Sequence, residues 1–160
     1  PSDIVIANCE AVQDNFHARF DAILREYHYH IETKRNPFTD RYSWLLGTPL
    51  DLDILNKTAK TLIGTHDFKA FCKGIPPADN YRCQIFEAEW FAKDSQIVFR
   101  ISANRFLRNM VRALVGTSIL VGTNKLTIEE FKQIIVTGTR ADAGNSVPAK
   151  GLTLTKVVYP

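Results

Sequence analysis

The stretch SANRFLRNMVRALVGTSILVG, residues 102–122, is the most informative part of this chain because its apolar and basic positions separate on a helix. At about 100° per residue, one side of such a helix carries the apolar or small residues Phe106, Met110, Ala113, Leu114 and Thr117. Arg105, Arg108 and Arg112 fall within an arc of roughly 60° on another side. Gly122 occupies the position of a C-terminal glycine cap. The pattern predicts a core-packed helix with an arginine face.

The arginine face has two interpretations. A guanidinium offers a planar fork of donors that matches phosphate or carboxylate, so three of them on one face can bind an anion. The alternative is an ordinary solvated face, which usually mixes both signs of charge. No Asp or Glu occurs between Ser102 and Thr127. This absence favours the anion-binding interpretation.

Length and composition indicate a single globular domain, residues 1–160. Hydrophobic residues make up 45% of the chain and charged residues 23%, which suits one core of ordinary size. The net charge is +3, and residues 81–160 carry 11 basic against 6 acidic side chains, which favours a polyanionic partner such as nucleic acid. Cys9, Cys72 and Cys83 are too scattered for a disulfide framework or a paired zinc motif, so we expect a cytoplasmic protein. No apolar stretch approaches the roughly 20 residues that span a membrane.

Alternation and turn signals predict several strands and two helices in addition to the arginine helix. Residues 25–31 read as a strand with Tyr27 and Tyr29 on one face and His28 and His30 on the other. Helical spacing over residues 52–63 ends at Gly64, and a capping box at residues 127–130 begins another helix. Residues 85–91 and 96–101 read as a hairpin, and residues 151–159 as a last strand. We predict an α+β fold in which helices cover one face of an antiparallel or mixed sheet.

Other candidate chemistry is weaker. Tyr27 and Tyr29 suit stacking on an unpaired base, although packing in the core is the default explanation for such rings. His28 and His30 lie two residues apart on a strand, but the sequence supplies no evident third ligand, so we expect no metal site. Asp142 lies in a flexible segment and is a candidate nucleophile or simply part of a turn.

Six motifs occur in a recognisable order. They are FHARF at 16–20, REY at 25–27, NPF at 36–38, GTHDFKAF at 64–71, the stretch 104–116 and PAKGL at 148–152. Together, and over nearly the whole chain, they resemble the C-terminal portion of the tRNA pseudouridine synthase A family. Glu26 departs from the family's pattern, which commonly has a basic residue there, and residues 79–85 match only loosely.

The resemblance implies an isomerase that converts uridines of the tRNA anticodon arm, at positions thirty-eight to forty, to pseudouridine. It also implies no metal or organic cofactor, tRNA as the partner and a homodimer. Tyr27 would stack on the target base, Arg112 would pair with the catalytic aspartate, and Gly151 and Leu152 would line the pocket. The assignment of Arg105 and Arg108 to RNA phosphates rests instead on their predicted place on the helix.

The family's nucleophilic aspartate lies in a Gly-Arg-Thr-Asp-Ala-Gly motif, which this chain lacks. TRADAG at residues 139–144 looks similar, but its place just before PAKGL matches a different family stretch, so we do not expect Asp142 to be the nucleophile. We therefore expect the C-terminal half of the enzyme, which binds tRNA, supports the active site and is inactive alone. The alternatives are a stand-alone RNA-binding module and a dimerising structural domain.

Overall fold

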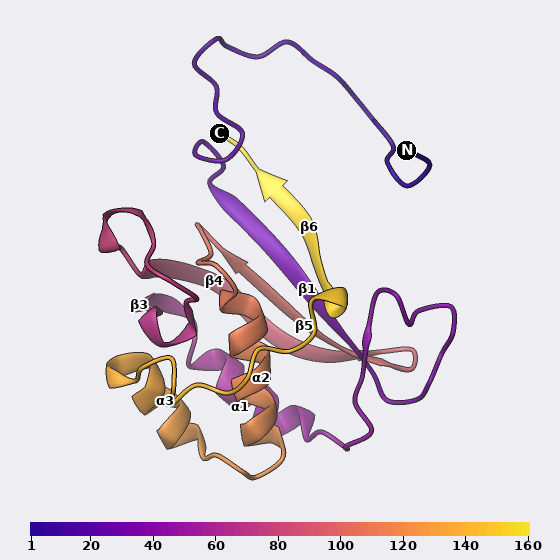
Figure 1. The fold of residues 1–160 in the computed structure, drawn as a ribbon, viewed down its shortest axis with the longest axis vertical. Helices are drawn as coiled ribbons and strands as arrows, with labels where there is room; N and C mark the ends of the chain where they lie inside the picture. The colour runs from indigo at the N-terminus through magenta and orange to yellow at the C-terminus, as the bar shows by residue number, and fades with distance from the viewer.

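The strand predicted at residues 25–31 lies inside a six-stranded mixed sheet (Figure 1). The structure, a computed structural model, describes residues 1–160. β1 (Leu24–Glu32) pairs antiparallel with β5 (Gln96–Ala103) on one side and with β6 (Leu152–Val158) on the other. The short β2 (Trp44–Leu45) pairs in parallel with the end of β1. Beyond β5 the sheet continues, antiparallel throughout, with β4 (Arg82–Lys93) and β3 (Gly64–Asp67).

Three α-helices gather beside this sheet (Figure 1). α1 (Leu52–Lys60) packs on β4 and α2 (Met110–Gly122), and α3 (Ile128–Thr137) packs on α2 and β3. Short 3-10 turns at Lys69–Phe71, Pro77–Asp79 and Ala149–Gly151 complete the secondary structure. None of the helices combines the length and apolar character that crossing a membrane requires. The predicted α+β class with a mixed sheet is confirmed.

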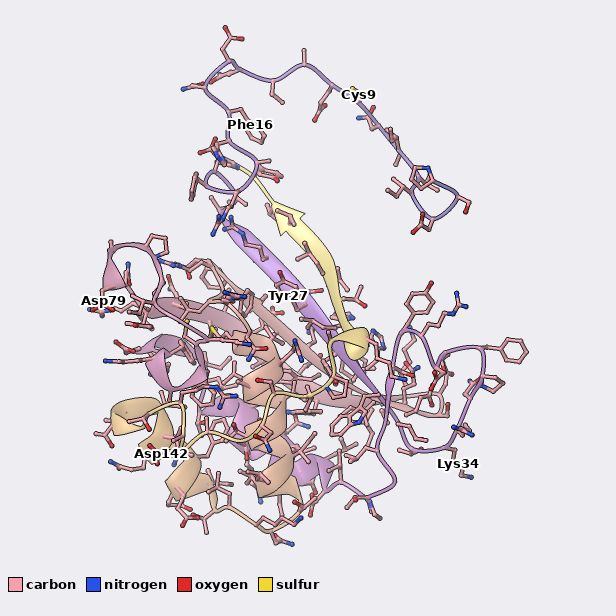
Figure 2. All side chains as sticks on the ribbon, in the orientation of Figure 1. Cys9, Phe16, Tyr27, Lys34, Asp79 and Asp142 are labelled. Carbon is pink, nitrogen blue, oxygen red and sulfur yellow. The ribbon has the colours of Figure 1, made fainter.

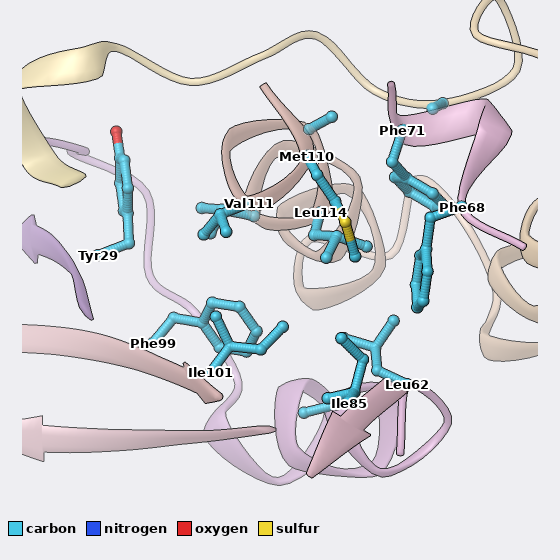
Figure 3. Packing of buried hydrophobic residues seen from close by; sticks show 14 of the residues in the cluster. Tyr29, Leu62, Phe68, Phe71, Ile85, Phe99, Ile101, Met110, Val111 and Leu114 are labelled. Carbon is cyan, nitrogen blue, oxygen red and sulfur yellow. The ribbon is translucent and has the colours of Figure 1, made fainter. Parts of the chain in front are cut away.

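The alternation of β1 explains how the two layers meet. Tyr29 and Ile31 are fully buried, and Tyr29 pairs across the sheet with the buried Phe99 of β5. Figure 3 shows these rings facing Val111 and Leu114 of α2. Burial of each such side chain contributes roughly 1.5–3 kcal/mol. The opposite face of β1 is polar and carries His28 and His30.

The expected start of the arginine helix is wrong by eight residues. Ser102 and Ala103 instead end β5, where each pairs with both β1 and β4. The backbone of Asn109 then adopts a left-handed conformation, with φ of 68°, immediately before α2 begins at Met110. Sheet pairing on two sides satisfies the backbone at residues 102–103, and the left-handed turn sets the first residue of the helix. Residues 104–109 are therefore a loop.

Two glycines have other roles than those expected. Gly122 is the last residue of α2 rather than its cap, and a Cβ there would lie 2.9 Å from Leu55 of α1, so glycine permits the helices to approach closely. Asn124, at φ of 56°, takes the left-handed position beyond the helix. Gly64, at φ of 105°, does not end α1 but begins β3.

The other local predictions are confirmed. The hairpin of β4 and β5 turns at Asp94, whose backbone φ is 53°. Thr127 and Glu130 form the capping box at the start of α3, with reciprocal hydrogen bonds of 3.1 and 2.8 Å. The last strand, β6, supplies the outer neighbour of β1.

The segment before β1 contains neither helix nor strand. Its first part projects away from the sheet, as Cys9 shows in Figure 2. The part nearer β1 folds onto the end of β6, where the Phe16 and Tyr159 rings lie 5.1 Å apart and the Tyr159 hydroxyl donates to the Ala18 carbonyl at 2.8 Å. This contact places residues 19–23 next to the first residues of β1.

Candidate functional site

Tyr27 lies at the edge of an open pocket next to the first part of β1. The pocket has a volume of about 670 Å³ and is lined by Arg19, Phe20, Ala22, Ile23, Arg25, Tyr27, Pro77, Asn104, Arg105 and Phe106. Tyr27 is half-buried, and its ring meets Phe106 edge to face at 5.2 Å between centroids. Its hydroxyl has no hydrogen-bond partner within the chain, unlike that of Tyr29, which donates to the Pro148 carbonyl at 2.8 Å. The pocket lining contains three arginines and no acidic residue.

Arg25 builds the wall of this pocket. Its guanidinium donates to the backbone carbonyls of Arg19, Ala22 and Asn104, and so ties the segment before β1 to the loop after β5. Asn104 in turn accepts from the Gln84 backbone N–H at 2.9 Å. The guanidinium of Arg25 thus binds neutral acceptors of its own chain, and its role is to stabilise the fold around the pocket.

Arg105 and Arg108 are not on a helix, which corrects the geometry from which their role was inferred. They belong to the loop between β5 and α2, in which Leu107 is buried and Arg108 is exposed. Arg105 lines the Tyr27 pocket. Neither side chain forms an ion pair or hydrogen bond within the chain. Arg105 is half-buried and Arg108 is exposed, so the loop carries both positive charges, although the helical face predicted for them does not exist.

Arg112 is the arginine that does lie on α2, and it is half-buried. Its Nε donates to the Val147 carbonyl at 2.6 Å, while the Val147 N–H donates back to the Arg112 carbonyl at 3.3 Å. Nη1 and Nη2 have no partner within the chain. The guanidinium is therefore fixed at one nitrogen and free along the edge that suits a two-pronged bond to a carboxylate.

Gly151 and Leu152 lie where β1, β6 and the preceding turn meet. A Cβ on Gly151 would lie 2.8 Å from Cζ of Tyr29 and 2.9 Å from the His30 carbonyl, so only glycine fits under that ring. Leu152 pairs with Tyr29 across the sheet and is half-buried. Both residues therefore contact Tyr29 and support the second tyrosine of β1.

Tyr29 connects the two candidate catalytic residues. It lies two residues from Tyr27 on the same face of β1, a separation of roughly 7 Å along a strand. Burial raises the pKa of Tyr29 well above its ordinary value, and the nearby Arg112 guanidinium opposes part of that rise. Tyr27 and Arg112 thus flank one buried ring, although each lines a different pocket.

The pocket beside Arg112 contains residues that the sequence analysis missed. It has a volume of about 510 Å³ and is lined by Lys73, Asn109, Arg112, Arg140, Ala141, Ala143, Asn145 and Ser146. Three of these side chains are cationic and none is acidic. Arg140 belongs to the TRADAG stretch, where the resemblance to the family's Arg-x-x-Ala-Gly pattern was the signal that could have identified it.

Asp142 lies far from Tyr27, as Figure 2 shows, in the exposed loop after α3. Its carboxylate accepts from the Thr139 backbone N–H at 2.7 Å and from the Thr139 hydroxyl at 2.8 Å, and these bonds lower its pKa. This is the hydrogen bonding of a local turn. The two histidines are also locally paired: His28 contacts Glu26 at 3.1 Å, and His30 contacts Gln96 at 2.9 Å.

Comparison with known proteins identifies relatives of this chain. The sequence profile of a family described as "tRNA pseudouridine synthase" matches residues 58–160. Proteins named tRNA pseudouridine synthase A from Porphyromonas gingivalis and Bacteroides fragilis are 44% and 42% identical over the whole chain, which covers 64% of each relative. The relative from Dictyoglomus thermophilum is 38% identical and is covered to 65%. The chain thus spans a little less than two thirds of these relatives, and it belongs to the tRNA pseudouridine synthase family.

Proposed function

We propose that this chain is the C-terminal, active-site-supporting half of a tRNA pseudouridine synthase that isomerises uridines of the tRNA anticodon arm at positions thirty-eight to forty. One observation carries the proposal. Arg112 is anchored through Nε to the Val147 carbonyl while both terminal nitrogens are free, which is the state required of an arginine that receives a carboxylate from outside this chain. The family's aspartate motif is absent here, so the nucleophile would come from the remaining part of the protein.

The catalytic groups are divided between this chain and the part of the protein that carries the aspartate. The reaction breaks the bond between C1′ of the ribose and N1 of uracil, turns the base, forms a bond from C1′ to C5 and removes the proton from C5. The aspartate must stay ionised in a partly dry pocket, and a two-pronged arginine partner favours the charged form. Tyr27, whose hydroxyl has no partner within the chain and whose ring meets Phe106 edge to face, is suited to stack on the turned base and to relay the C5 proton. The hydroxyl oxygen would take the C5 proton as its own hydrogen passes to solvent, and N1 would take a proton from solvent.

The RNA surface is the Tyr27 pocket together with Arg105 and Arg108. Aromatic rings interleaved with arginines, with no acidic residue in the lining, provide both stacking and phosphate contacts. If these arginines contact phosphates, each of the variants Arg105→Ala and Arg108→Ala should reduce the slope of log affinity for tRNA against log salt by up to about one unit. An unchanged slope in both variants would remove them from the interface.

Release of tritium from tRNA labelled at C5 of uracil tests the proposed reaction. The whole protein should release tritium, and the 160-residue chain alone should not, because it lacks the nucleophile. Turnover by the isolated chain that disappears in Asp142→Asn would reverse this assignment. tRNA binding without turnover by the whole protein would instead support a binding module. The same proposal includes a cytoplasmic location, which cell fractionation tests, and a homodimer, which sedimentation of the whole protein tests.

A further inference from the structure

The loop between α3 and β6, residues 139–148, lies along α2 as a strap. The Gly144 N–H donates to the Thr117 hydroxyl at 2.9 Å. A Cβ on Gly116 would lie 1.9 Å from the Asn145 carbonyl oxygen, so the backbones of strap and helix are in direct contact. These contacts hold the middle of the strap to the middle of α2, one turn beyond Arg112.

The end of the strap is held separately, by a second arginine. Arg140 Nη1 donates to the carbonyls of Ala143 and Gly144 at 3.3 and 3.1 Å, and Nη2 donates to the Ser146 hydroxyl at 3.0 Å. Asn109 Nδ2 donates to the same hydroxyl oxygen. A hydroxyl oxygen has two lone pairs, so both are used and the position of Ser146 is fixed from two sides.

Asn109 gives up an ordinary role to make this bond. It is the N-cap residue of α2, a position where an asparagine side chain usually accepts from the first free N–H groups of the helix. Here the side chain makes no such bond and reaches Ser146 instead. The first N–H groups of α2 therefore lack a bond from the Asn109 side chain, which instead holds Ser146 near the end of the strap.

The residue after Ser146 is Val147, whose carbonyl holds Arg112 Nε at 2.6 Å. We propose that Arg140 is a positioning residue which, through Ser146 and Val147, fixes the Arg112 guanidinium in the orientation that receives the catalytic carboxylate. The inference rests on the role proposed above for Arg112. Because Thr117 and Gly116 hold the strap without it, Arg140 is not needed to keep the strap on α2.

A double-mutant cycle in the whole protein tests the inference. Arg140→Gln should lower the single-turnover rate of pseudouridine formation about 10- to 100-fold, because small displacements of a catalytic group have effects of that order. tRNA affinity should stay near the parent value. Rates are compared per folded molecule, because the loss of three hydrogen bonds lowers the melting temperature. In the Arg112→Ala background the same substitution should have almost no effect on the rate, since Arg140 would act only through Arg112. Arg140→Lys, which reaches fewer acceptors, should give an intermediate rate.

Asp142→Ala is the matched control, because it removes the hydrogen bonds of the turn at Thr139 in the same strap without touching Ser146. It should keep the parent rate. The inference is overturned if Arg140→Gln keeps the parent rate, if it lowers the rate equally in both backgrounds, or if Asp142→Ala lowers the rate as much. A normal rate in Arg112→Ala alone would instead reject the proposed role of Arg112, and the inference with it.

Discussion

The pocket beside Tyr27 and the pocket beside Arg112 are built in opposite ways. Beside Tyr27, the guanidinium of Arg25 donates to three backbone carbonyls of its own chain. The rest of the pocket lining includes aromatic rings together with Arg19 and Arg105. Beside Arg112, the strap of residues 139–148 supplies the acceptors, and the fork of Arg112 is left free. An arginine whose two terminal nitrogens are both bonded to its own chain stabilises the fold, and one held only through Nε keeps its terminal nitrogens available for a ligand.

This comparison predicts the largest effect at Arg112. Arg112→Lys in the whole protein should lower the rate of the chemical step by on the order of 100-fold or more, since an ammonium cannot reproduce a two-pronged pairing with a carboxylate. tRNA affinity should change far less. Single-turnover rates and equilibrium binding, measured on the same preparation, separate these quantities. A loss confined to affinity would mean that Arg112 only adds positive charge.

At Arg25 the effect should fall on stability. Arg25→Ala leaves three backbone carbonyls without their donor, which we expect to lower the free energy of unfolding by about 2–3 kcal/mol. For a chain of this size that corresponds to a melting temperature lower by roughly 5–10 °C. Arg105→Ala is the control: its side chain has no partner within the chain, so the melting temperature should hardly move. Equal melting temperatures for the two variants would contradict the distinction between the pockets.

Tyr27 tests whether the first pocket binds a base. Tyr27→Phe keeps the aromatic face and should bind tRNA nearly as well as the parent, whereas Tyr27→Leu should lose roughly 1–3 kcal/mol of binding free energy. If the hydroxyl relays the C5 proton, the phenylalanine variant should bind but turn over slowly. A tyrosine that only packs against Phe106 would behave differently: both variants would lower the melting temperature without changing the rate per folded molecule. A normal rate in Tyr27→Leu would exclude Tyr27 from the active site.

The sequence predicted the parts of this site that depend on local pattern. Alternation over residues 25–31 placed Tyr27 and Tyr29 on one face of a strand, and the order of motifs singled out Arg112. The start of α2 was mispredicted because Ser102 and Ala103 pair with strands far away in the sequence, which no helical periodicity reveals. The Arg-x-x-Ala-Gly resemblance could have marked Arg140 as a residue of interest, but its connection to Arg112 could not be predicted from the sequence. Its effect on Arg112 passes through backbone carbonyls and a hydroxyl, acceptors whose location depends on the tertiary fold.

The smallest expected effect is at Tyr29, the buried tyrosine of β1. Tyr29→Phe removes the hydrogen bond to the Pro148 carbonyl and should cost about 1 kcal/mol of stability at neutral pH. Burial raises the pKa of Tyr29 in the folded state above that in the unfolded chain, which is near 10. Folding therefore favours the protonated phenol, so the contribution of this group is complete below about pH 10 and is lost as the pH rises further.

The stability of the parent should thus fall more steeply above pH 10 than that of Tyr29→Phe, and the difference between the two should shrink or reverse there. Denaturant unfolding of both proteins from pH 7 to 11 measures it, and lysine and cysteine titrations cancel in the comparison because the two proteins share them. Parallel curves over the whole range would show that the Tyr29 hydroxyl is open to solvent. The hydrogen bond from Tyr29 to Pro148, which ties the end of the strap to β1, would then be absent in solution.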